Sequence, residues 1–100
     1  MILVRALIGE VLRERRQELG MTLREVSADA RVSLGYISEI ERGQKEASSE
    51  CLGAISGAVD LPLSELMSRL SEAIAEEESQ AVVAKLPRDA RTPVVTDVAA

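Results

Sequence analysis

Signals that end one helix and start the next alternate along this 100-residue chain. Gly20 and Gly43 are suited to ending helices, because glycine adopts the left-handed backbone conformation at little cost. Hydroxyl residues that can cap the first free N–H groups of a helix stand at three points: Thr22 after Gly20, Ser33 after the short connector Arg31-Val32, and Ser48 in the loop after Gly43. These signals divide the chain into a series of helices that would pack against one another.

Between these signals, apolar side chains recur with the 3.6-residue period of an amphipathic helix. The pattern predicts helices over residues 6–19, 23–30, 34–42, 48–59 and 63–86, and Pro62 is well suited to the first turn of the last of them. No alternating pattern of any length predicts a strand, so we expect an all-α fold. Two of the helices, 23–30 and 34–42, are short and separated by a tight turn, as in a helix-turn-helix.

The composition excludes several classes of site. The chain has no histidine and a single cysteine, Cys51, so an imidazole base, a disulfide within the chain and a cysteine-type zinc cluster are excluded. We therefore expect no enzyme activity, no cofactor and no metal. No apolar run approaches the roughly 18 residues of a membrane span, and no signal peptide is evident, so we expect a cytoplasmic protein without membrane contact.

The residues from Thr22 to Gly43, TLREVSADARVSLGYISEIERG, resemble the helix-turn-helix of the Xre/Cro (phage-repressor-like) family. The tripeptide Glu41-Arg42-Gly43 is the most distinctive match, and Arg16 stands where members carry a basic residue that pairs with that glutamate. Within the family, the string is similar to actinobacterial regulators of Clp protease genes. Three positions depart from the pattern: Leu23 replaces a glutamine that holds a phosphate, Arg31 replaces the glycine of the turn, and Ala47 replaces a proline.

The resemblance implies a five-helix repressor-like domain whose last helix is extended for dimerisation. Residues 1–66 would form the DNA-binding domain, with the motif at about 22–43, and 63–86 would form the dimerisation helix. Residues 87–100 would form a flexible tail. Leu66, Met67, Leu70 and Ile74 are the expected dimer interface, because this apolar stripe is longer than so small a core requires.

Helix 34–42 would lie in the major groove. The residues expected to face the bases are Ser33, Leu34, Gly35, Tyr36, Ser38 and Glu39, with Tyr36 turned away from Ile37 and Ile40. The residues expected to contact phosphates are Thr22, Arg24, Arg42, Gln44 and Lys45. Arg16 and Glu41 are expected to form a structural ion pair, whereas Arg13, Arg15 and Lys85 are expected to lie on solvated helix faces.

The formal net charge is −5, which by itself argues against the strongly basic domain typical of nucleic-acid binding. The acidity is concentrated in residues 46–100, which hold 10 acidic and 4 basic side chains, whereas residues 1–45 hold 7 acidic and 8 basic. We therefore expect weak non-specific affinity for DNA, with specificity coming mainly from groove contacts.

The resemblance thus predicts a dimeric, sequence-specific regulator that binds operator DNA and activates Clp protease and proteostasis genes. RNA polymerase and Clp protease are possible partners of such a regulator. The end of the chain, Val98, Ala99 and Ala100, is similar to the tails that Clp proteases recognise and is a candidate degradation signal. The alternative is an antitoxin-like or adaptor module whose acidic C-terminal half binds a protein.

Overall fold

The computed structural model describes the backbone of residues 2–85 and the side chains of residues 2–81. Within that part of the chain it contains five helices and no strand: α1 (Val4–Glu18), α2 (Leu23–Ala30), α3 (Leu34–Glu41), α4 (Ser49–Ala58) and α5 (Leu63–Lys85). The predicted all-α class and the five helices are confirmed. The predicted tail, with Val98, Ala99 and Ala100, lies outside the described residues.

The helix ends follow from the residues that the sequence places there. Gly20 and Gly43 have positive φ angles of 68° and 74°, the left-handed conformation that ends a helix. Thr22 forms a complete capping box with Glu25, in which each side chain binds the other residue's backbone N–H. Ser33 and Ser48 cap α3 and α4 in the simpler way, by accepting one backbone N–H each. Only the start of α1 differs noticeably, since that helix begins at Val4 rather than at residue 6.

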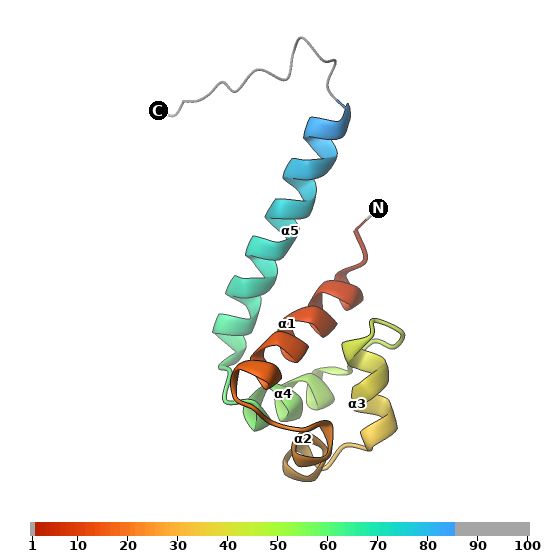
Figure 1. The fold of residues 1–100 in the computed structure, drawn as a ribbon, viewed down its shortest axis with the longest axis vertical. Helices are drawn as coiled ribbons and strands as arrows, with labels where there is room; N and C mark the ends of the chain where they lie inside the picture. The colour runs from red at the N-terminus through yellow and green to blue at the C-terminus, as the bar shows by residue number, and fades with distance from the viewer. Residues whose placement is uncertain (1, 86–100) are drawn as a thin grey trace.

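The core is aliphatic apart from the buried Ser56 and is shared by all five helices. Its fully buried members come from each of them: Leu12, Val26, Ile37, Ile40, Ile55, Val59 and Leu66. α5 runs beside α1, and its C-terminal half extends beyond the other helices (Figure 1). The start of α5 therefore contributes to the core of the domain, whereas the end of α5 projects from the domain.

Two of the residues predicted for a dimer interface belong to this core. Leu66 is 0% exposed and Leu70 is 7% exposed within a single chain. The sequence prediction was wrong for Leu66, because α1 packs against the first turns of α5 and covers that part of the stripe, whereas the small exposed part of Leu70 still lines a groove beside Met67 and Ile74. Met67, in contrast, is 42% exposed, and Ile74 is half-buried.

None of the helices described combines the length and the apolar composition that crossing a lipid bilayer requires.

Candidate nucleic-acid interface

The turn between α2 and α3 is held by its own backbone and by one hydroxyl. Arg31 takes the left-handed conformation, with φ 59° and ψ 43°, at the position where the family pattern led us to expect glycine. The Ser27 hydroxyl donates to the carbonyl of Val32, and the Val32 N–H donates back to the Ser27 carbonyl at 3.3 Å. These bonds fix the angle between the two helices although the turn lacks glycine.

α3 divides into a buried face and an exposed N-terminal turn. Ile37 and Ile40 are 0% and 1% exposed and anchor the helix in the core. Ser33, Leu34 and Gly35 are exposed, and a Cβ added to Gly35 would meet no atom within 4 Å. Ser38 and Glu39 are half-buried. Three of the predicted base-facing residues therefore form an exposed N-terminal turn of α3. The major groove of DNA could receive this turn.

Tyr36 differs from the sequence expectation. Its ring packs against the edge of the core rather than away from it, and its hydroxyl donates to the carbonyl of Glu46 at 2.8 Å. A phenol has one hydrogen to donate, so this bond occupies the hydrogen that a phosphate would need. Tyr36 thus joins α3 to the loop that follows it.

The predicted phosphate contacts are all exposed: Thr22, Arg24, Arg42, Gln44 and Lys45. The Thr22 hydroxyl accepts the Glu25 N–H at 3.0 Å, which leaves its own hydrogen free for an anion. Arg42 is oriented by hydrogen bonds to Ser38 Oγ and to Gln44 Oε1, the latter at 3.2 Å.

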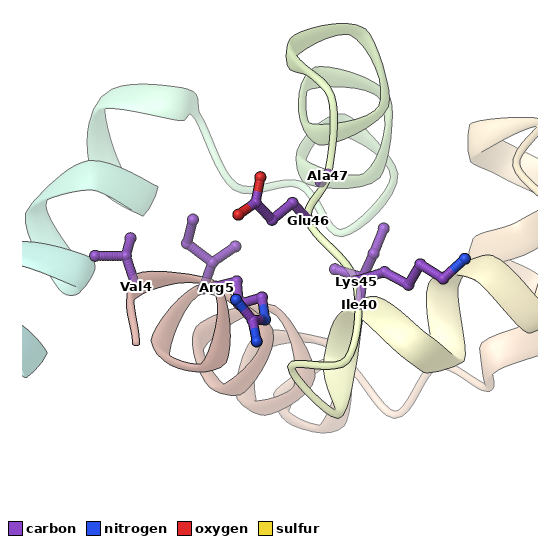
Figure 2. Close-up of a pocket in the computed structure, with 7 residues that line it drawn as sticks. Val4, Arg5, Ile40, Lys45, Glu46 and Ala47 are labelled. Carbon is purple, nitrogen blue, oxygen red and sulfur yellow. The ribbon is translucent and has the colours of Figure 1, made fainter. Parts of the chain in front are cut away.

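The loop after α3 separates two opposite charges. Lys45 and Glu46 extend in opposite directions from the backbone, with Glu46 on the side of Val4 and Arg5 (Figure 2). Together with Ile8, Ile40 and Ala47, these residues line a pocket of about 230 Å³ between the loop and α1. The Lys45 ammonium group is thereby kept apart from the nearest carboxylate in the sequence.

Arg16 and Glu41 form the expected ion pair between α1 and α3. Arg16 Nε and Nη2 donate to the two carboxylate oxygens at 2.8 and 3.0 Å, and Nη1 donates to the Met21 carbonyl at 2.9 Å. Their side chains are only 14% and 7% exposed. The hydrogen bonds to Glu41 raise the pKa of the Arg16 guanidinium above its ordinary value, and burial acts against that rise. The ion pair of Arg16 with Glu41 therefore fixes the orientation of α3 relative to α1.

Two further contacts between α1 and α3 were not anticipated from the sequence. A Cβ added to Gly9 would lie 2.3 Å from the carbonyl oxygen of Ile40, so only glycine fits where the helices cross. At the end of α3, Arg5 Nε donates to the Gly43 carbonyl at 2.9 Å. Gly9 carried no signal beyond being a glycine inside a helical pattern, which often marks close backbone approach.

Arg15 also differs from the prediction of a solvated helix face. Its guanidinium donates to the carbonyls of Val59 and Asp60, both at 3.0 Å, where α4 ends. The carbonyl groups at a helix end have no partner within the helix, and a nearby cation stabilises them. Arg15 thus fastens α1 to the turn between α4 and α5.

Comparison with known proteins identifies the family to which this chain belongs. Residues 12–66, which span the end of α1 to the start of α5, match the family described as helix-turn-helix. The chain belongs to the Xre/Cro helix-turn-helix family. The resemblance predicted from Thr22–Gly43 is thereby confirmed, and it extends well beyond the motif itself.

Individual members agree with this assignment. The transcriptional regulator ClgR of Mycobacterium tuberculosis is 58% identical over 76 residues, which cover 76% of this chain and 68% of that protein. The crystal structure of the clp gene regulator ClgR from Corynebacterium glutamicum superposes with a TM-score of 0.77 at 37% identity. That match covers 84% of this chain and 89% of the other.

A more distant helix-turn-helix member shares the fold alone. The restriction-modification controller protein C.Esp1396I, solved bound to a 25 base pair operator site, gives a TM-score of 0.69 at 21% identity. The match covers 75% of this chain and 99% of that protein. The names of the two ClgR proteins agree with the prediction of a regulator rather than an enzyme.

Proposed function

We propose that this chain is a sequence-specific DNA-binding transcriptional regulator of Clp protease genes, with α3 as its recognition helix. The observation that carries the proposal is the exposed N-terminal turn of α3, held by a buried ion pair and flanked by exposed cationic and hydroxyl side chains. A helix presented in this way offers its first residues to base edges while the flanking groups contact phosphates. The control of Clp genes rests on similarity to the ClgR proteins.

The individual contacts follow from the chemistry of each side chain. Leu34, 37% exposed, can pack against a thymine methyl group, and Gly35 permits close approach of the helix backbone to the DNA. The Glu39 carboxylate can accept a hydrogen bond from cytosine N4. Arg24, Gln44 and Lys45 lie at the ends of the motif, where phosphate contacts would set its register.

We further infer that the regulator acts as a homodimer, because one helix-turn-helix reads only about half a turn of duplex. Met67, Ser71, Ile74 and Ala75 line an apolar groove of about 280 Å³ on α5, together with Leu70 and Glu78. A second copy of α5 would fill this groove and place two α3 helices on one face of the DNA. Activation through RNA polymerase and turnover by Clp protease remain predictions.

Fluorescence anisotropy on a duplex from the chain's own promoter, compared with a scrambled duplex at two salt concentrations, tests the proposal. We expect tighter binding to the promoter duplex and a steep loss of affinity with salt. Equal affinity for both duplexes would contradict sequence-specific regulation.

A matched pair of substitutions locates the contact on α3. Gly35→Glu should abolish promoter binding, because it brings a carboxylate to the DNA, whereas Gly57→Glu on α4 should bind normally. Both glycines are exposed and would accept a Cβ without any atom within 4 Å, so both variants should fold. Promoter binding by Gly35→Glu at the unsubstituted level would argue against α3 as the recognition helix.

A further inference from the structure

A cationic pocket lies where α1, the start of α2 and the end of α3 meet. It has a volume of about 200 Å³ and is lined by Arg13, Arg16, Leu23, Ser38, Glu41 and Arg42. Three guanidinium groups and one carboxylate therefore surround a space that opens beside the recognition helix.

The positive charge of Arg16 is already compensated and is not available to a ligand in this pocket. All three of its guanidinium nitrogens donate to Glu41 or to the Met21 carbonyl, and the carboxylate neutralises its charge. Arg42 and Arg13, in contrast, have no carboxylate partner among residues 2–81. Arg42 binds only neutral oxygen atoms, those of Ser38 and Gln44. Arg13 is exposed and, among residues 2–81, forms no hydrogen bond or ion pair.

The position of the pocket suits a backbone phosphate. Ser38 belongs to the predicted base-facing set, and Leu23 is the first residue of α2, where backbone N–H groups have no partner within the helix. Two guanidinium groups with unused donors, one of them oriented by Ser38 and Gln44, match the multiple acceptors of a phosphodiester.

We propose that Arg13 and Arg42 together hold one phosphate of the DNA backbone, so that α1 contributes a DNA-binding residue. The inference rests on the proposed function, because the phosphate belongs to the bound duplex. It also explains how the first turn of α2 is anchored on DNA when Leu23 has no side-chain donor. The contact is electrostatic and carries no sequence information.

The test is the salt dependence of binding by Arg13→Gln. Neutralising one phosphate contributes about −0.9 to the slope of log Kobs against log salt concentration. Because Arg42 would still hold the shared phosphate, Arg13→Gln should lose a measurable part of that contribution, at most about 0.9. Its affinity should fall by the same factor on promoter and scrambled duplexes. Arg13→Lys, which keeps the charge, should retain the slope.

Arg69→Gln is the matched control, since it removes the same charge from α5, where Arg69 pairs with Glu18 and Glu65. This control should leave the slope unchanged. Thermal melting should show that Arg13→Gln is as stable as the unsubstituted chain, because the residue is exposed and glutamine is a good helix former.

An unchanged slope in Arg13→Gln, or a loss confined to the promoter duplex, would overturn the phosphate contact while leaving the proposed function in place. If the unsubstituted chain itself fails to prefer its promoter, the proposed function falls and the inference falls with it.

Titration of inorganic phosphate at fixed ionic strength, followed by NMR, separates a free anion from the DNA backbone. We expect no saturable binding of phosphate alone at millimolar concentration. Saturable binding that Arg13→Gln abolishes, with the DNA slope unchanged, would assign the pocket to a free anion and overturn the proposal.

Discussion

At Gly9, the crossing of α1 over α3 leaves no room for a side chain. The position that a Cβ would occupy lies 2.3 Å from the Ile40 carbonyl oxygen and 2.7 Å from that of Glu41. Both contacts are to backbone, which cannot move aside as the end of a flexible side chain can. The orientation of the recognition helix therefore depends on the absence of a single methyl group.

Gly9→Ala should destabilise the domain by about 1–3 kcal/mol, the usual cost of forcing an extra methyl group into a packed site. Gly53→Ala is the matched control, because that glycine lies exposed inside α4 with no atom within 4 Å. It should stabilise the domain by about 0.5–1 kcal/mol through the better helix propensity of alanine. Urea denaturation measures both, and equal free energies of unfolding would contradict the close crossing.

At the scale of the helices, α1 packs against α3 and α5, and a side chain also links it to the turn after α4. Its Arg16 binds α3 through Glu41, and its Arg15 binds the carbonyls of Val59 and Asp60 directly after α4. Adjacent arginines on one helix thus hold two different elements. The turn after α4 needs this support, because Asp60 there has a positive φ of 52°, which is unfavourable for a residue other than glycine.

Arg15→Gln should lower the free energy of unfolding by about 1–3 kcal/mol, since hydrogen bonds from a charged donor to part-buried carbonyls are lost. DNA binding by the folded protein should be unchanged, because Arg15 lies at the α4 end of the domain. Arg13→Gln is expected to show the opposite pattern, with stability kept and DNA affinity reduced. Thermal melting together with anisotropy on both variants checks this, and a DNA defect in folded Arg15→Gln would contradict it.

On the scale of the whole molecule, the net charge of −5 combines two regions of different character. The excess of acidic residues belongs to positions 46–100, whereas positions 1–45 are close to neutral. α5 carries Glu76, Glu77 and Glu78 in its C-terminal half, where Glu77 lies beside the start of α1. Much of the excess negative charge therefore lies on α5, whereas the recognition helix carries Glu39 and Glu41.

The groove on α5 leads to a prediction about assembly. Met67→Glu should weaken self-association at least about tenfold, because a carboxylate would be buried against a second copy without a partner. Ser68→Glu, which adds the same charge to an adjacent exposed position outside the groove, should associate normally. Sedimentation velocity at several concentrations measures both, and a single-chain mass for the unsubstituted protein throughout would contradict the dimer.

Local signals in the sequence determined the helices and the class of fold. Caps such as Thr22 and stops such as Gly43 act on neighbouring backbone groups, so their effect can be predicted without knowing what packs where. The Arg16–Glu41 pair was also predictable, but only through the family resemblance, since 25 residues separate the partners.

Only the tertiary structure decided which surfaces are covered. Leu66 and Met67 are both apolar residues of one helix, yet α1 covers the first and leaves the second exposed. The same reason applies to Arg13, Arg15 and Tyr36, whose roles depend on the distant element that each one faces. Helical periodicity indicates which residues share a face, but the packing of helices far apart in sequence determines what that face meets.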